Sequence, residues 1–344
     1  MTAQIHVFRV FDKNFVLDVN SGSVLQLDDL AFDILKNYDL NTDEKVLQDL
    51  QSKYPKSKIT EVLDEIKILK DEGYLFTEVD AKPILGKLEN RYYVKSLCLN
   101  VAHDCNLRCK YCFASKGNYS GKRELMSSEV GKKAVDFLVE NSGNMRNVEI
   151  DFFGGEPLLA METVKEVVSY AKTLEKEYRK RFNFTITTNA LLLDDNTINY
   201  LHKNMDNVVL SLDGRKNVND HIRVRADGSG SYDDIVYKIQ KMVELRERDK
   251  KEYYVRGTFT RYNLDLAEDV FHLADLGFRE ISIEPVVGND GDYLLKEEDL
   301  RVLFEQYGRI AAEYLRRKKT GENPFRFYHF NMDIYHGPCI YKRL

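Results

Sequence analysis

The sequence reads Cys105-Asn106-Leu107-Arg108-Cys109-Lys110-Tyr111-Cys112-Phe113 directly after an apolar strand pattern at 95–101. Three thiolates so close together can ligate three irons of a cubane cluster and leave the fourth iron without a protein ligand. Structural zinc is one alternative, but it takes four ligands, and His103 is the only local candidate for the fourth. Chance clustering is the other alternative. We therefore predict that Cys105, Cys109 and Cys112 hold a catalytic iron–sulfur cluster.

From residue 94 onward, strand patterns alternate with amphipathic helix patterns, which indicates a parallel sheet covered by helices. The predicted strands are 95–101, 148–153, 184–188, 207–212, 253–260 and 280–285. Helical periodicity is clear at 164–171, 235–243, 266–274 and 297–317. Six such units are too few for a closed eight-stranded barrel. They predict an open, partial (β/α)6 barrel over 94–318, with its site at the carboxyl ends of the strands.

Polar and glycine-rich motifs end the second, third and fourth predicted strands. They are Gly154-Gly155-Glu156-Pro157, Thr187-Thr188-Asn189 and Ser211-Leu212-Asp213-Gly214. Glycines permit close backbone approach, and a simple turn would not explain the carboxylate of Glu156. Polar residues at strand ends are often only turn formers, which weakens the case for Thr188 and Asn189. Arg256 and Glu284, on the last two strands, are predicted to face the barrel interior as site residues, because charges on core strands are costly unless paired.

The cysteine spacing, with aromatic Tyr111 before the last cysteine, resembles the signature of the radical S-adenosylmethionine (SAM) superfamily. In that family the amino and carboxylate groups of SAM chelate the open iron of a [4Fe–4S] cluster. An electron from the cluster then breaks a carbon–sulfur bond to give the 5′-deoxyadenosyl radical. The resemblance therefore implies an enzyme with two cofactors, the cluster and SAM.

The same resemblance implies roles for the strand-end residues. Glu156 is expected to bind the methionine ammonium, and Ser211 and Asp213 the ribose. Arg223 is expected to bind the SAM carboxylate, although Arg225 is close enough to be confused with it. The adenine is expected near Phe113 and Val286. The full predicted cofactor-binding set is Tyr111, Phe113, Gly154, Gly155, Glu156, Pro157, Thr188, Asn189, Ser211, Asp213, Arg223 and Val286.

Residues 1–78 form a separate α+β pattern, in which strands at 7–11, 15–19 and 24–27 precede three helices and a final strand at 74–76. This order predicts a small winged-helix-like domain. Residues 79–93, with Pro83 and Gly86, look like a linker. The domain resembles the peptide-recognition elements of ribosomal-peptide maturases, which bind a leader peptide as an added strand. A regulatory or purely structural winged helix is the alternative.

The composition restricts partners and location. With 43% hydrophobic residues, 31% charged residues and a formal charge of −5, the chain suits a globular protein and gives no reason to expect a nucleic-acid partner. It has neither an apolar stretch of ~20 residues nor a signal peptide, so we expect a cytoplasmic protein without a membrane partner. Cys98, on the first barrel strand, is predicted to be a core residue rather than a ligand.

The whole chain, through His336-Gly337-Pro338-Cys339, resembles the maturases of SCIFF peptides (six cysteines in forty-five residues). This implies a cysteine-rich precursor peptide with a leader as substrate and a flavodoxin- or ferredoxin-like low-potential electron donor. It also implies thioether cross-links between cysteine sulfur and a peptide α-carbon.

Such maturases carry a C-terminal SPASM or twitch-like extension that binds auxiliary [4Fe–4S] clusters. Cys339 matches the position where those ligands begin, so 319–344 is expected to be the start of a truncated extension. One alternative function is another SPASM-type enzyme, either an anaerobic sulfatase-maturing enzyme or a peptide epimerase. The other is a non-catalytic leader-binding protein.

Overall fold

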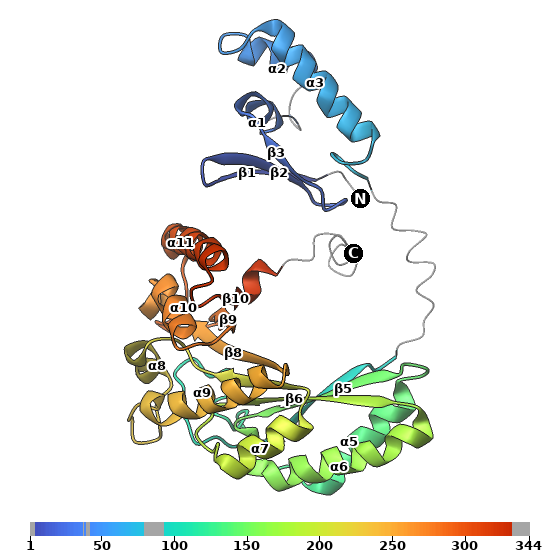
Figure 1. Cartoon of the computed structure of the whole chain (residues 1–344), viewed down its shortest axis with the longest axis vertical. Coiled ribbons are helices and arrows are strands. Elements are labelled where there is room, and N and C mark those ends of the chain that lie inside the picture. The colour runs from blue at the N-terminus through green and yellow to red at the C-terminus, as the bar shows by residue number, and fades with distance from the viewer. Residues whose placement is uncertain (1–3, 37, 39–41, 79–92, 332–344) are drawn as a thin grey trace. The chain divides into compact units, whose positions relative to one another are not determined.

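A computed structural model of the chain describes residues 4–36, 38, 42–78 and 93–331 (Figure 1). These residues form two compact units, one before and one after residues 79–92. Each unit has its own hydrophobic core, and the two cores share no residue. Within the described ranges, no helix is long and apolar enough to cross a membrane.

The first unit is a three-stranded antiparallel sheet followed by three helices. The strands are β1 (Ile5–Val10), β2 (Lys13–Asp18) and β3 (Val24–Leu27), paired in that order. The helices are α1 (Asp29–Leu35), α2 (Asp43–Leu50) and α3 (Lys56–Asp71). The side chains of Asp28 and Thr42 accept hydrogen bonds from backbone N–H groups in the first turns of α1 and α2, which fixes where these helices begin. The apolar faces of the three helices pack on Val16 of β2.

The predicted strand at 74–76 is wrong. Leu75 and Phe76 are nevertheless buried in the core of this unit. The backbone of Phe76, however, has φ +53°, in the left-handed region, which interrupts an extended strand.

The second unit is built on a parallel sheet in which the strands lie side by side in chain order. The strands are β4 (Ser96–Ala102), β5 (Asn147–Gly154), β6 (Arg181–Thr188), β7 (Asn207–Ser211), β8 (Glu252–Phe259), β9 (Glu280–Pro285) and the short β10 (Arg326–Phe327). The prediction of a partial (β/α)6 barrel with a small domain before it is confirmed, with β10 as one strand more than predicted.

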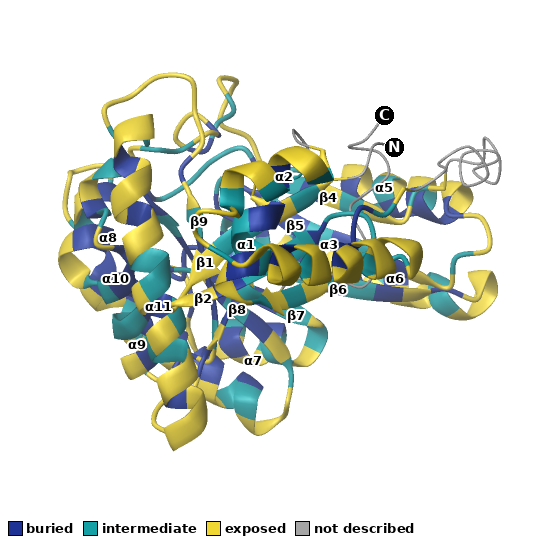
Figure 2. Cartoon of the chain, turned by 90° about the horizontal axis from the view of Figure 1, so that it is seen from above, coloured by how far each residue is buried: buried dark blue, intermediate teal, exposed yellow. Residues whose placement is uncertain are grey.

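Helices cover one face of this sheet (Figure 1). They are α5 (Ser128–Asn141), α6 (Met161–Tyr178), α7 (Asp195–Asn204), α8 (Lys216–Ile222), α9 (Tyr232–Arg248), α10 (Leu266–Asp275) and α11 (Leu300–Thr320). Strand residues alternate between buried and partly exposed, as along β6, and the helices carry buried and exposed bands (Figure 2). The buried side chains pack against the helices. The other set lines what we call the inner face of the sheet.

The prediction that Cys98 is a core residue is wrong, because its thiol is exposed. In β4 the alternation buries Leu99 and Val101 and leaves Cys98 on the opposite, inner face.

Candidate functional site

Cys105, Cys109 and Cys112 lie on the loop between β4 and α5, at the carboxyl edge of the sheet. Backbone hydrogen bonds hold this loop: Arg108 N–H donates to the Val224 carbonyl at 2.7 Å, and Lys110 N–H to the Ile222 carbonyl at 3.1 Å. Glycines allow the end of β5 to press against the same loop. A Cβ added at Gly155 would lie 2.1 Å from the Asp104 carbonyl oxygen. The conformation of the loop therefore depends on glycine at this position.

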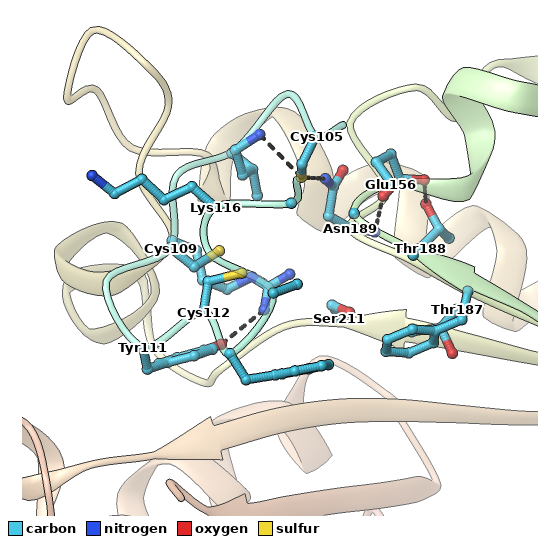
Figure 3. A pocket seen from close by; sticks show the side chains of 18 residues that line it. Cys105, Cys109, Tyr111, Cys112, Lys116, Glu156, Thr187, Thr188, Asn189 and Ser211 are labelled. Atoms are coloured by element: carbon cyan, nitrogen blue, oxygen red, sulfur yellow. Dashed lines mark hydrogen bonds between the residues drawn. The ribbon is translucent and has the colours of Figure 1, made fainter. Parts of the chain in front are cut away.

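Cys105, Cys109 and Cys112 line one cavity together with the ends of β5, β6 and β7 (Figure 3). Within the described ranges, no three His, Cys, Asp or Glu side chains are close enough to ligate a single metal ion. A cubane cluster does not need such closeness, because each of its cysteines ligates a different iron. The arrangement of the three cysteines is thus compatible with a cubane cluster.

The environment of the thiols fits an iron–sulfur cluster. Burial raises the pKa of the Cys109 thiol to about 12 and also raises the pKa of Cys105. A raised pKa favours the protonated thiol, but a bound metal reverses this, because a coordinated thiol is deprotonated. Cys105 Sγ also accepts hydrogen bonds from Leu107 N–H at 3.3 Å and from Asn189 Nδ2 at 3.6 Å. N–H donors to sulfur are a means by which proteins tune such clusters. The residues present therefore suit a cluster with three cysteine ligands.

Glu156, from the glycine-rich motif at the end of β5, lines the cavity and has 1% of its surface exposed. It accepts hydrogen bonds from Thr188 Oγ1 and Asn189 N–H, each at 2.8 Å, and from Leu158 N–H at 3.1 Å. Burial raises the pKa of this carboxyl, against the effect of the three donors. A cationic ligand in the cavity would stabilise its charged form.

Arg223, Tyr111 and Asp213 form a buried polar group on the other side of the cysteines. Arg223 Nη1 donates to Tyr111 Oη at 2.9 Å, and Tyr111 donates to Asp213 Oδ2 at 2.7 Å. Arg223 Nη1 also lies 3.6 Å from Asp213 Oδ1. Its Nε is buried without a hydrogen-bond partner among the described residues. This unsatisfied donor beside the cavity fits an anionic group such as the SAM carboxylate.

Arg225, the alternative to Arg223, points elsewhere. Its guanidinium donates to the Gly230 carbonyl at 2.6 Å and pairs with Asp234 at the start of α9. It does not line the cavity that contains the cysteines. Only Arg223, of these two arginines, is therefore in position to contact a ligand there.

Most of the residues predicted from the sequence line this one cavity, namely Cys105, Cys109, Tyr111, Cys112, Phe113, Gly154, Gly155, Glu156, Thr188, Asn189, Ser211 and Arg223. Asp213 does not line the cavity, but it contacts two lining residues, Tyr111 and Arg223. Pro157 and Val286 are buried outside the lining, and Cys339 lies outside the described residues.

Sequence reasoning missed further lining residues, among them Lys116, Gly117 and Phe153. Gly117 lies on the cysteine loop, where a Cβ would fall 2.5 Å from Cys105 Cβ. A glycine so soon after the cysteine motif is the sequence signal for this close approach. Phe153 precedes the glycine motif, and its ring stacks on Phe113 with centroids 6.3 Å apart.

Comparison with known proteins gives a family match and relatives. Residues 99–255 match the Radical SAM superfamily. The radical SAM cyclopropyl synthase TigE of Paramaledivibacter caminithermalis is 25% identical over 340 residues, covering 89% of this chain and 70% of TigE. The cysteine-type anaerobic sulfatase-maturating enzyme of Clostridium novyi is 28% identical over 169 residues, covering 47% of this chain and 43% of that protein.

A solved structure similar in fold is anSMEcpe with bound AdoMet and Kp18Cys peptide. It superposes with a TM-score of 0.58 at 21% identity, covering 69% of this chain and 64% of that one. The chain thus spans less than two thirds of that structure's length.

Proposed function

Taking as premise that the chain is a radical SAM enzyme, whose domain spans residues 99–255, we propose that it modifies a ribosomally made, cysteine-rich peptide. The modification is a thioether cross-link between a cysteine sulfur and a peptide α-carbon. When bound, the [4Fe–4S] cluster and SAM supply the 5′-deoxyadenosyl radical that removes hydrogen from that carbon.

In this proposal the cavity residues bind and orient the cofactors. Cys105, Cys109 and Cys112 hold the cluster, and Asn189 supports Cys105 through its N–H···S contact. The carboxylate of Glu156 accepts from the methionine ammonium, and the free Nε of Arg223 donates to the carboxylate of SAM. Asp213 keeps Arg223 and Tyr111 in position. The ribose is assigned to Ser211, which lines the same cavity.

The observation that carries the peptide assignment is the folded unit of residues 4–78 ahead of the radical SAM domain. In its sheet β2 pairs with both β1 and β3, and no described strand pairs with the outer edge of β3. An unpaired strand edge can bind an extended peptide through backbone hydrogen bonds. Val24 of β3 is 45% exposed, which offers an apolar contact to such a peptide.

This assignment gives each part of the chain a proposed role. Residues 1–78 are the leader-recognition element, 79–93 the linker and 94–318 the catalytic barrel. Within 319–344, β10 still belongs to the sheet of the barrel, and the auxiliary-cluster region is proposed to follow it, with Cys339 as a ligand there. Electrons are proposed to come from a flavodoxin- or ferredoxin-like donor. The reducing cytoplasm is the proposed location, because cluster cysteines and an exposed thiol at Cys98 suit it.

The test is anaerobic incubation of the reconstituted protein with SAM, a reductant and a cysteine-rich peptide with its leader, followed by mass spectrometry. We expect the peptide to lose a pair of hydrogens and one cysteine to resist alkylation. Cys109→Ala should abolish deoxyadenosine release, whereas Cys98→Ala, which removes an exposed thiol away from the cavity, should not. An unmodified peptide beside abundant deoxyadenosine would contradict the thioether assignment.

A second candidate is another SPASM-type reaction, favoured by the similarity to sulfatase-maturating enzymes. The same experiment separates the candidates. An epimerase run in deuterated water adds deuterium without loss of mass, and a sulfatase-maturing enzyme acts on a peptide that lacks the leader. A non-catalytic leader-binding protein would release no deoxyadenosine.

A further inference from the structure

The inner face of the sheet carries a row of polar side chains that extends from the cofactor cavity toward β9. Ser211 of β7 lines the cavity, and it is in register with Arg256 of β8, which is in register with Ser282 of β9. Neighbours in register on parallel strands present their side chains on the same face. Glu284, two residues beyond Ser282, therefore shares this face and lies closer to the carboxyl edge.

Glu284 belongs to a chain of hydrogen bonds that links three elements. Its Oε1 accepts from Ser282 Oγ at 2.7 Å, and its Oε2 lies 2.9 Å from His329 Nε2. His329 Nδ1 lies 2.6 Å from the hydroxyl of Tyr307 on α11. An ionised carboxylate only accepts, so His329 Nε2 carries a proton and donates it in a hydrogen bond to Glu284. With the ring proton on Nε2, Nδ1 accepts from the hydroxyl of Tyr307, whose pKa is raised by burial to about 12.

The carboxylate remains open to a ligand. The side chains of Glu284 and His329 are 29% and 19% exposed. Arg256 on β8 is near enough to Glu284 to lower its pKa, and the side chain of Arg256 forms no hydrogen bond or ion pair with the described residues. Burial acts to raise the pKa of Glu284, but the hydrogen bonds from Ser282 and His329 outweigh it and hold the pKa below its usual value. Two donors leave acceptor capacity on a carboxylate, which has about four lone-pair sites.

Glu284 lies at the same level along the strands as Asp213, the partner of Tyr111 and Arg223 beside the cofactor cavity. Asp213 Oδ1 accepts from Thr258 N–H at 3.1 Å, and Thr258 is in register with Glu284. Because neighbouring strands lie about 4.8 Å apart, roughly 10 Å separates the backbones at Asp213 and Glu284. Glu284 therefore lies two strands away from Asp213, at the same height along the sheet.

We propose that Glu284 is the proton acceptor for the peptide cysteine thiol, and that His329 and Tyr307 are positioning residues that hold it. This inference rests on the proposed thioether reaction. The α-carbon gives its hydrogen atom to the deoxyadenosyl radical, the C–S bond forms and the S–H bond breaks. The proton goes to Glu284, and the surplus electron goes to a one-electron acceptor of the iron–sulfur class. The S–H proton becomes strongly acidic as sulfur loses electron density, so a carboxylate is a sufficient base.

The deciding variant is Glu284→Gln, which keeps the shape but cannot take the proton. We expect the rate of thioether formation to fall about a hundredfold or more, the scale of general-base contributions. Deoxyadenosine formation without peptide and peptide affinity by fluorescence anisotropy should both stay within about threefold of wild type, a difference of less than ~0.7 kcal/mol. Release of deoxyadenosine without cross-linking is a readout that a merely structural role would not give.

The matched control is Glu280→Gln, on the same face and strand but at the opposite end, where Glu280 pairs with Arg326 at 3.4 Å. It should leave cross-linking unchanged. Tyr307→Phe, which keeps the ring stacked on His329 but loses one hydrogen bond of ~1 kcal/mol, should slow cross-linking by about fivefold. A melting temperature measured for each variant verifies folding.

Two failures are distinguishable. If the wild-type protein forms no thioether, the proposed function falls and this inference falls with it. If the wild-type protein forms the thioether and Glu284→Gln forms it at the same rate, only the inference is overturned.

Discussion

Arg223 is 8% exposed, and a buried charge is stable only where other groups compensate it. Asp213 and Tyr111 supply part of that compensation, but Nε has no partner among the described residues. Arg223 is therefore expected to bind an anion more tightly than a surface arginine would. Its planar fork can satisfy Tyr111, Asp213 and a ligand carboxylate at once, which the single ammonium of a lysine cannot do.

We predict that Arg223→Lys weakens SAM binding by about ten- to a hundredfold, the equivalent of one charge-assisted hydrogen bond of ~1.5–3 kcal/mol. Equilibrium dialysis of the cluster-loaded protein measures this affinity. Arg225→Lys is the matched control, because Arg225 is bonded to Gly230 and Asp234 outside the cavity. Equal weakening in both variants would contradict the assignment of Arg223.

Single residues were predictable where the chemistry is local in the sequence. The cysteines, Glu156 and Arg223 stand in short motifs, and the structure gathers them around one cavity. His329 was missed because it follows β9 at a distance in the chain and belongs to no motif. Its contact with Glu284 arises only when β10 pairs with β9. The pairing of β10 with β9 involves only two residues of β10, too few to show a periodic pattern in the sequence.

The junction between β4 and β5 depends on the absence of side chains. A Cβ at Gly155 would meet the Asp104 carbonyl, a backbone atom that cannot turn away. We predict that Gly155→Ala destabilises the fold by about 1–3 kcal/mol, as overpacking does, and displaces the cysteine loop. Urea unfolding measures the first effect, and the yield of cluster reconstitution the second.

The control for this variant is Gly308→Ala in α11. No atom lies within 4 Å of a Cβ at that position. Alanine has the higher helix propensity, so a gain of about 0.5–1 kcal/mol is expected. If both alanine variants were equally stable, the steric account of Gly155 would be wrong.

Helix α11 is tied to α10 by charged side chains. Arg317, 6% exposed, donates to Glu313 and Asp275, each at 2.7 Å, and Arg316 also pairs with Glu313. The hydrogen bonds that Arg316 and Arg317 donate to Glu313 lower the pKa of its carboxyl to about 2. A folded-state pKa below the unfolded value gives stability that is present above pH ~4.5 and is lost as the pH falls toward 2.

We therefore predict that Glu313→Gln lowers the free energy of unfolding by about 1 kcal/mol at pH 7, after allowance for solvent screening. The difference from wild type should shrink between about pH 4.5 and pH 2, because protonated wild type also lacks the charge. Thermal unfolding across this range measures it. Glu305→Gln, which removes an exposed pair 3.7 Å from Arg301, is the control and should change the free energy of unfolding at pH 7 by less than about 0.5 kcal/mol.

Elements were predictable to the extent that burial alternates with a regular period. The six long strands and helices α6, α9, α10 and α11 of the second unit were identified for this reason, whereas α5 and α7 were not predicted. Helix α8 was missed because it is short and largely polar, and β10 because two residues carry no period. The strand at 74–76 was predicted but is not formed. The apolar run there correctly indicates burial, but the left-handed backbone at Phe76 prevents an extended strand.

The division of the chain into two folded units follows from its separate hydrophobic patterns. Residues 4–78 bury one apolar set and residues 93–331 another. The change from antiparallel strands to alternating strand and helix was visible in the sequence. The edge of the sheet that carries the candidate site was predictable too, because parallel strands bring every strand-end motif to one side. What the sequence could not give is which inner-face side chains contact one another.

Because the two cores share no residue, we predict that deleting residues 1–78 leaves the radical SAM domain folded and able to cleave SAM without peptide. Binding of the leader peptide should weaken at least tenfold, a loss of about 1.4 kcal/mol or more, because the edge of β3 is gone. Fluorescence anisotropy with a labelled leader measures the affinity, and a scrambled leader on the full chain sets the baseline. If the shortened protein binds the leader as tightly as the full chain, the recognition site lies in the barrel and the role proposed for β3 is wrong.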